Sequence, residues 1–271
     1  MSTFKIQRYN PEKGAKPYMQ TYQVPIKPGM SVLDCLFYIK ENLDATLSFR
    51  ASCRMGICGS CAMYINGLPR LACETQVRSL HTDTIEIKPL PNYEIIKDLV
   101  VDLTPLFYKH QKVKPWIITS DPLELDRPTK EYYQSPAQLE SYLQFAYCLK
   151  CGICLSACPT VATDEEFLGP QALAQAFRYS SDNRDNGFKE RISVVDTLHG
   201  LWRCHMAGAC AEVCPKGVDP ALAIQLMKRQ AIFGQKKEQT RLLEAPLEAT
   251  TKPGIPKAPE PTVKKKTVKK K

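Results

Sequence analysis

The chain has 271 residues, of which 44% are hydrophobic and 24% charged, and its formal net charge is +9. This length suits one large or two small domains. The sequence contains no apolar run of about 18 residues, which is the length that a membrane-spanning helix needs. Residues 1–10 show neither a signal peptide's apolar core nor an Arg- and Ser-rich transit pattern, so we expect a reducing, cytoplasmic setting for the 12 cysteines.

The N-terminal third predicts strands crossed by one helix. Alternating apolar residues predict strands at 4–7 and 20–24. A capping-box pattern from Ser31 to Asp34 opens a helix. One face of that helix collects the apolar residues Val32, Cys35, Leu36, Ile39 and Leu43. We therefore interpret Cys35 as a small buried core residue and not as a metal ligand.

The first cysteine group has the spacing C-x4-C-x2-C-x11-C and consists of Cys53, Cys58, Cys61 and Cys73. The first three match the plant-type [2Fe-2S] pattern, in which a loop wraps the cluster and a distant cysteine closes it. Small residues at Gly56, Gly59 and Ser60 let the backbone approach sulfur, so we expect amides of residues 54–60 to tune this centre. An Asn66-Gly67 turn predicts a hairpin that returns Cys73 toward Cys61.

Beyond this hairpin the pattern changes to helical. Residues 105–136 are rich in proline and aromatic residues without clear periodicity, which predicts a connector and a domain boundary near residue 105. Helices are predicted at 136–146, at 170–180 and from Asp219-Pro220 to Gly234. The fold class is therefore α+β, with a β-grasp ferredoxin-like domain at 1–105, a helical bacterial-ferredoxin-like domain at 106–240 and a tail at 241–271.

Two further cysteine runs lie in the helical part. The first is C-x2-C-x2-C-x3-C-P, the bacterial iron-sulfur run, and the second would repeat it if position 207 were not Ala207. In two-cluster ferredoxins the fourth cysteine of each run ligates the other run's cluster. The spacing therefore predicts a [4Fe-4S] site held by Cys148, Cys151, Cys154 and Cys214. It likewise predicts a [3Fe-4S] site held by Cys158, Cys204 and Cys210.

Structural zinc is the main alternative for these cysteines, because four-cysteine zinc sites also use C-x2-C pairs. Such sites combine two short pairs, whereas the run at 148–158 packs too many thiols into one turn. A disulfide framework fits less well, since the sequence shows no secretory context.

Most of the positive charge lies in residues 245–271, where eight lysines and two glutamates give +6. This proline- and lysine-rich composition predicts a disordered tail. The tail could serve as a solubilising segment, bind an anionic membrane leaflet or bind nucleic acid. On its own it does not indicate a DNA-binding protein, and we expect no nucleic-acid partner.

The order of the three cysteine groups resembles the iron-sulfur subunit of the succinate dehydrogenase / fumarate reductase family, over about residues 4–232. The most specific stretches are SCRMGICGSC at 52–61, CLKCGICLSACP at 148–159, FLGP at 167–170, RDNGFKER at 184–191 and CPKGVDP at 214–220. These are closer to fumarate-reductase-type members, although His205 is common in succinate dehydrogenases. Val161, Ala162 and Thr163 replace a tryptophan pair of many ubiquinone-linked members, which favours menaquinone.

The resemblance implies a subunit that carries single electrons between FAD of a flavoprotein partner and quinone at a membrane anchor, by way of the three clusters. It implies one or more anchor subunits, of the kind that can carry haem b, and a peripheral position on the cytoplasmic face of the cell membrane. The chain itself has no G-x-G-x-x-G fingerprint, so we assign it no catalytic residue for the organic substrate.

At the quinone end, the family match carries over to Pro159, Thr160, His205 and Lys228, and Trp202 is a neighbour. A solvated surface lysine is the alternative for Lys228. For His205 the alternative is a hydrogen bond to cluster sulfur or backbone.

The alternative of another class is an iron-sulfur subunit of a heterodisulfide-reductase or glycolate-oxidase type complex. Such subunits usually keep both runs complete and lack the N-terminal [2Fe-2S] motif. Ala207 and the group at 53–73 therefore argue against it.

Overall fold

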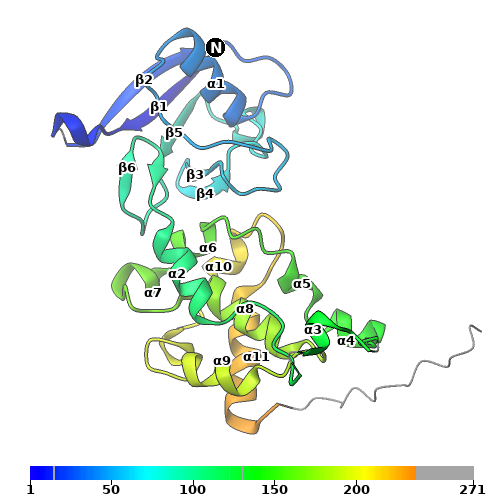
Figure 1. Cartoon of the computed structure of the whole chain (residues 1–271). Coiled ribbons are helices and arrows are strands. Elements are labelled where there is room, and N and C mark those ends of the chain that lie inside the picture. Colours follow the sequence, from blue (N-terminus) through cyan, green and yellow to red (C-terminus); the bar gives the residue numbers. More distant parts are fainter. Residues whose placement is uncertain (15, 122, 130, 236–271) are drawn as a thin grey trace, which may run out of the picture.

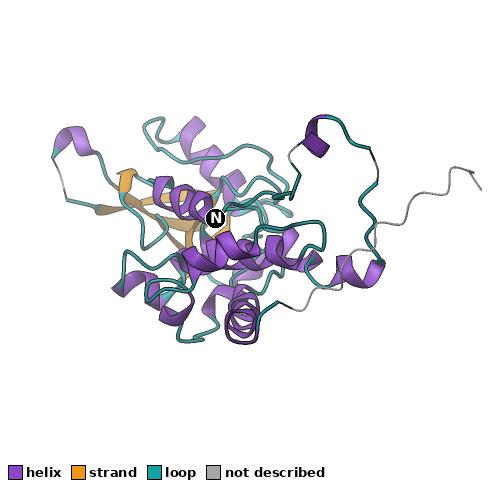
Figure 2. Ribbon diagram, turned by 60° about the horizontal axis from the view of Figure 1, so that its bottom comes forward, coloured by secondary structure: helices purple, strands orange, loops and turns teal. Residues whose placement is uncertain are grey.

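The computed structural model describes residues 1–235 except 15, 122 and 130, so the predictions for the tail at 241–271 lie outside the described residues. Figure 1 shows a sheet-containing N-terminal part and a helical C-terminal part, with α2 (Thr104–Lys112) beside the junction. In Figure 2 the strands form one group, and most of the remaining chain is helix and loop. The α+β class predicted from the sequence is confirmed.

The N-terminal part is a β-grasp sheet crossed by one helix. Its sheet order is β2-β1-β5-β3-β4, in which β1 pairs with β5 in parallel and the other neighbours are antiparallel. A separate ribbon joins β6 to β7. In chain order the elements are β1 Ser2–Arg8, η1 Pro11–Lys13, β2 Tyr18–Val24, α1 Val32–Asn42, β3 Ala62–Ile65, β4 Leu68–Leu71, η2 Arg78–Leu80, β5 Thr84–Lys88, β6 Ile95–Lys97 and β7 Val100–Val101.

Helix α1 begins at the predicted capping box. The Ser31 hydroxyl accepts from the Asp34 amide at 3.2 Å, and the Asp34 carboxylate accepts from the Ser31 amide at 2.9 Å. Cys35 is fully buried on the core face, and burial raises the pKa of its thiol to about 12. The prediction that Leu43 shares this face was wrong: the helix ends at Asn42, and Leu43 is 49% exposed.

Short helices surround two longer ones, α8 and α11, in the C-terminal part. The helix predicted at 170–180 is α8, and that predicted from Asp219 is α11, which ends at Gly234 as expected. After α2, the elements are α3 Leu123–Asp126, α4 Pro136–Glu140, α5 Leu143–Ala146, α6 Ile153–Ser156, α7 Pro159–Thr163, α8 Gly169–Ser181, α9 Phe188–Val195, η3 Leu201–Arg203, α10 Ala209–Glu212 and α11 Pro220–Phe233. Among the described residues, no helix has the length and apolar character needed to cross a bilayer.

The predicted connector at 105–136 was partly wrong. Its first residues form α2, whose only fully buried side chain is Leu106, and the buried Val113 follows at the end of the helix on the same face. The helix predicted at 136–146 is broken into α4 and α5. Figures 1 and 2 show the rest of this region as a loop-rich extension that projects from the body.

Each part has its own hydrophobic core, and the two cores meet at a hydrogen-bonded junction, where Ile153 of the helical part enters the first core and Tyr93 packs against both. Leu103 packs against the first core, whereas Leu106 belongs to the second. Across the junction, the Tyr93 hydroxyl donates to the Gly152 carbonyl at 3.0 Å, and the Asn92 amide donates to the Leu155 carbonyl at 3.0 Å. Both acceptors lie in the first bacterial-type run, so these bonds fix that run against the N-terminal part.

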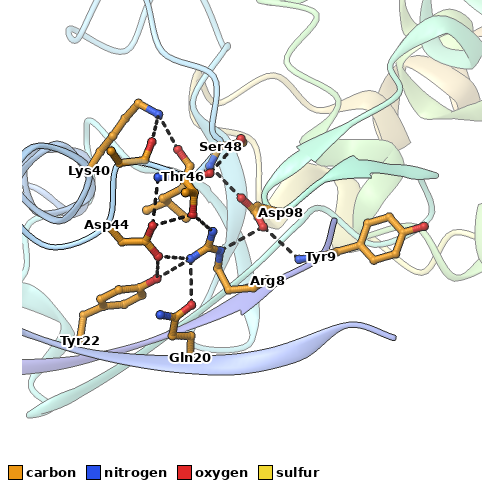
Figure 3. Close-up of polar contacts among 11 residues, drawn as sticks. Arg8, Tyr9, Gln20, Tyr22, Lys40, Asp44, Thr46, Ser48 and Asp98 are labelled. Atoms are coloured by element: carbon orange, nitrogen blue, oxygen red, sulfur yellow. Dashed lines mark hydrogen bonds and ion pairs between the residues drawn. The ribbon is translucent and has the colours of Figure 1, made fainter. Parts of the chain in front are cut away.

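A buried arginine braces the segment that leads into the first cysteine loop (Figure 3). The Arg8 guanidinium donates to the carboxylates of Asp44 and Asp98 and to the Thr46 hydroxyl. Asp98 also accepts from the Ser48 amide at 2.9 Å. Because these groups are largely buried, the paired charges stabilise one another in a low-dielectric environment. The chain just before the cysteine loop is thereby tied to β1 and to the ribbon.

Candidate iron-sulfur sites

The loop between Cys53 and Cys58 points backbone amides at sulfur. The Ile57 and Cys58 amides donate to Cys53 Sγ at 3.3 and 3.2 Å, and the Gly56 amide donates to Cys73 Sγ at 3.2 Å. Gly56 has φ +68°, a conformation that glycine adopts without strain. These donors stabilise negative charge on the thiolates, which is the role predicted for the backbone amides of residues 54–60.

The hairpin brings the thiols of Cys61 and Cys73 together. Asn66 and Gly67 both have positive φ, 46° and 83°, as a tight hairpin turn requires. After it, the Ala72 amide donates to the Cys61 carbonyl at 3.0 Å, which places Cys73 beside Cys61. Burial raises the pKa of the Cys61 thiol to about 12.

Cys58 lies in the opposite environment, exposed at the edge of the loop. Hydrogen bonds from the Ser60 hydroxyl, and then from backbone, lower the pKa of its thiol to about 6. The loop thus combines an accessible, acidic thiol with buried ones. This is a suitable setting for a cluster near the surface.

The second group of thiols surrounds one cavity. Its lining contains Cys148, Cys151, Cys154 and Cys214, which is the set predicted to hold a [4Fe-4S] cluster. Burial raises the pKa of the Cys151 thiol to about 12, and burial with neighbouring thiols raises that of Cys154 well above its usual value. Burial favours the protonated thiol, but a bound cation stabilises the deprotonated thiolate. This set of donors therefore suits iron.

The third group of thiols surrounds a cavity lined by Cys158, Cys204 and Cys210. Ala207 lines the same cavity, so a methyl group lies where a complete run would place its thiol. Burial, followed by the nearby thiols of Cys158 and Cys204, raises the pKa of Cys210 to about 12. Three thiols and one apolar corner fit a cluster with three irons.

The residues predicted near a quinone gather at or beside this third cavity: Pro159, Thr160, Trp202, His205 and Lys228. Pro159, Thr160 and His205 line it. Lys228 Nζ donates to the Cys204 carbonyl at 3.1 Å and lies 5.7 Å from the centre of the Trp202 ring. The part-buried Lys228 is therefore bonded to the backbone of a predicted cluster ligand. A quinone contact for these residues stays a prediction.

The first two sites touch each other. A Cβ on Gly59 would lie 2.6 Å from the Cys151 Cβ, so the [2Fe-2S] loop packs directly on a predicted [4Fe-4S] ligand. Beside this contact, Lys216 Nζ pairs with Glu74 Oε1 at 3.1 Å across the two parts of the chain. No sequence motif marks this pair, and it was missed because its partners are 142 residues apart.

Among the residues that the structure describes, no group of three or more His, Cys, Asp or Glu side chains could hold a single metal ion. A structural zinc ion needs four ligands at about 2.3 Å from one centre when all are thiolates. Thiolates of an iron-sulfur cluster instead bind different irons of one larger group. The buried thiols around the two cavities, and the amide-lined loop, fit groups of this larger kind.

Comparison with known protein families gives one match in the N-terminal part of the chain and one in the helical part. Residues 3–108 match the model of a 2Fe-2S iron-sulfur cluster binding domain, and residues 144–218 match that of a 4Fe-4S dicluster domain. Among solved structures, the Mycobacterium smegmatis Sdh1 complex in the apo form contains a chain with TM-score 0.75 at 24% identity, covering 88% of this chain and 98% of that one. At this identity the likeness shows the fold.

Curated relatives show the family. The fumarate reductase iron-sulfur subunit of Haemophilus influenzae is 47% identical over 228 residues, which cover 81% of this chain and 89% of that protein. That of Mycobacterium tuberculosis is 46% identical over 227 residues, 84% and 91% of the two chains. The mitochondrial succinate dehydrogenase [ubiquinone] iron-sulfur subunit of Dictyostelium discoideum is 39% identical over 235 residues, 83% and 80%. The chain therefore belongs to the family of fumarate reductase and succinate dehydrogenase iron-sulfur subunits.

Proposed function

We propose that this chain is the electron-transfer subunit of a membrane-bound succinate:quinone oxidoreductase, passing electrons between FAD of a flavoprotein subunit and quinone at a membrane anchor. The observation that carries the proposal is the sequence of three cysteine groups, each beside the next, from the β-grasp sheet to α11. Family membership supports it over a heterodisulfide-reductase or glycolate-oxidase type complex.

The ligand assignment is part of the proposal. We assign Cys53, Cys58, Cys61 and Cys73 to [2Fe-2S], Cys148, Cys151, Cys154 and Cys214 to [4Fe-4S], and Cys158, Cys204 and Cys210 to [3Fe-4S]. The grouping of the last seven around two cavities supports cross-ligation between the runs. When bound, these groups supply one-electron carriers. The protein's own contribution is to hold them at fixed spacing, donate hydrogen bonds to sulfur and exclude water.

The domain division at 1–105 and 106–240 is also proposed, because the hydrophobic core changes between Leu103 and Leu106. Each predicted domain would then hold its own kind of site: one [2Fe-2S] site in the first and the two cavity sites in the second.

The membrane side is assigned to the third cavity. Loss of one thiolate there reduces negative charge, which favours accepting an electron and suits a terminal centre. We propose menaquinone as the quinone, since Val161, Ala162 and Thr163 stand where many ubiquinone-linked members carry tryptophans. One or more anchor subunits, of the kind that can carry haem b, would hold the chain at the cytoplasmic face of the cell membrane.

Iron content and electron paramagnetic resonance of the purified chain test the assignment. Eleven ligands, all the cysteines except Cys35, should hold roughly nine irons as one cluster of each kind. A Cys35→Ser variant is the matched control and should keep all three signals, because Cys35 is buried in the sheet core. Stable iron near six or twelve would contradict the assignment.

The complex itself tests the function. A complex isolated through this chain should contain FAD and oxidise succinate with a quinone acceptor. A complex that holds the three clusters but lacks FAD and succinate oxidation would overturn the proposed function while leaving the ligand assignment intact.

A further inference from the structure

We propose that Gln171 is a positioning residue for the [4Fe-4S] centre, whose side-chain amide donates a hydrogen bond to the Cys148 thiolate and raises that centre's reduction potential. The inference rests on the proposed ligand assignment. It concerns a residue outside the three cysteine groups, which no motif in the sequence identifies.

The geometry places the amide at the cavity. Gln171 lies in the first turns of α8, is 2% exposed and lines the cavity together with the four thiols of the second group. Its Nε2 lies 3.9 Å from Cys148 Sγ, a long hydrogen bond compared with the 3.2–3.5 Å of the backbone amides that donate to sulfur in the first cysteine loop. Such a bond stabilises negative charge on the sulfur.

The same amide nitrogen has a second partner, which can accept from it in one tautomer of the ring. Gln171 Nε2 also lies 3.1 Å from His110 Nδ1, on α2. Burial, with Lys150 nearby, lowers the pKa of His110 to about 4, so the ring is neutral at neutral pH. With its proton on Nε2, the ring accepts at Nδ1. The two hydrogens of the Gln171 amide then have two acceptors, the imidazole and the thiolate.

The amide oxygen of Gln171 makes no comparable contact among the described residues. Within the described part of the chain, Gln171 Oε1 is buried and accepts no hydrogen bond. An unsatisfied buried oxygen costs free energy that an apolar side chain of the same size would avoid. The hydrogen bonds that the Gln171 side chain makes here are therefore those that its Nε2 donates, to the Cys148 sulfur and to the His110 imidazole.

Substitution with an isosteric side chain that cannot donate tests the proposal. Gln171→Met keeps the length of the side chain and removes the amide. The potential of each cluster would be followed in the purified complex by redox titration with electron paramagnetic resonance. We expect the [4Fe-4S] potential to fall while the [2Fe-2S] and [3Fe-4S] potentials stay unchanged. An exchangeable proton coupled to the reduced [4Fe-4S] centre should also be lost.

The same helix offers a matched control. Gln175 lies one turn later, is also buried, and donates through Nε2 to the Phe145 carbonyl at 2.9 Å instead of to sulfur. Gln175→Met removes a buried amide from the same helix, so it should lower stability without moving the [4Fe-4S] potential. If Gln171→Met does not assemble, Gln171→Leu also removes the donor without adding charge, and it should lower the potential too.

The outcomes separate this inference from the proposed function. A [4Fe-4S] signal with the same potential in the wild type and in Gln171→Met would overturn the role of Gln171 and leave the ligand assignment standing. Equal shifts in the Gln171 and Gln175 variants would show a general loss of packing and would also overturn it. A wild-type complex without any [4Fe-4S] signal would refute the ligand assignment itself.

Discussion

Gly59 and Cys151 lie in van der Waals contact with no room between them for a methyl group, since a Cβ on Gly59 would be 2.6 Å from the Cys151 Cβ. The contact joins the loop of one predicted centre to a ligand of the next. Because electron transfer between centres weakens with distance, a residue without a side chain here keeps the two sites close. Gly59 also has φ +73°, which suits glycine.

Gly59→Ala should therefore separate the two sites. The change introduces backbone strain of about 1–2 kcal/mol and a clash with Cys151, so we expect a lower melting temperature and weaker magnetic coupling between the reduced [2Fe-2S] and [4Fe-4S] centres. Gly67→Ala is the control: it has φ +83° with no atom within 4 Å of its Cβ position, so it carries the strain alone. Equal coupling in both variants would show that the contact between Gly59 and Cys151 does not determine the spacing of the two centres.

The Arg8 network predicts sensitivity to acid (Figure 3). Hydrogen bonds from Thr46, Tyr22 and Arg8 outweigh burial and hold the pKa of Asp44 well below its usual range. A carboxylate with a depressed folded-state pKa stabilises the fold above its unfolded value of about 3.9, and this contribution is lost as pH falls through the folded-state pKa. Asp44 thus contributes to stability at neutral pH and progressively less below about pH 4.

Asp44→Asn should lower the free energy of unfolding by about 3 kcal/mol at neutral pH, because it leaves a buried arginine with one carboxylate fewer. It should also flatten the pH dependence of that free energy below about pH 4, as measured by chemical denaturation. Glu86→Gln is the control, since its exposed pair with Lys88 should contribute about 0–1 kcal/mol. An unchanged acid slope in Asp44→Asn would assign the sensitivity to other groups.

Local sequence signals predicted the elements whose ends depend on their own residues. The Ser31–Asp34 capping box, the Asn66-Gly67 turn and the Asp219 to Gly234 helix each appear where expected. In each case short-range hydrogen bonding or backbone conformation determines the structure. The cysteine spacings likewise grouped the thiols as they gather around the two cavities.

Features that depend on distant partners could not be predicted this way. Helix α2 packs on the second core through Leu106, and Val113 joins that core seven residues later; two apolar residues are too few to mark a helix within a segment rich in proline and aromatic residues. The parallel pairing of β1 with β5 joins segments about eighty residues apart. Gln171, His110 and Tyr93 gain their roles only from contacts across the fold. Each of these was missed because no residue nearby in sequence marks the partner.

Ala207→Cys tests the missing corner of the third centre. Ala207 lines the same cavity as Cys158, Cys204 and Cys210, so a thiol there should complete a set of four. We expect the oxidised [3Fe-4S] resonance to disappear, roughly one iron per chain to be gained, and the potential of the centre to fall, because a further thiolate adds negative charge. A serine at this position is the control for polarity and should bind iron less well. An unchanged [3Fe-4S] resonance would mean that the new thiol cannot reach the vacant corner.

Lys228 provides the test of where electrons leave the chain. Its ammonium donates to the carbonyl of Cys204 and lies beside Trp202, at the cavity that His205 also lines. Reduction of a quinone builds negative charge on its oxygens, which a lysine ammonium can stabilise. Lys228→Leu should therefore depress quinone-linked turnover, by about 10²-fold or more if the charge is used directly, while succinate oxidation with an artificial acceptor that takes electrons from the flavin persists.

Arg229→Leu removes a positive charge from the next position of the same helix, where the side chain is exposed, and should leave both activities intact. Equal loss of both activities in Lys228→Leu would indicate failed assembly, and full retention of both would leave Lys228 with only its structural bond to Cys204.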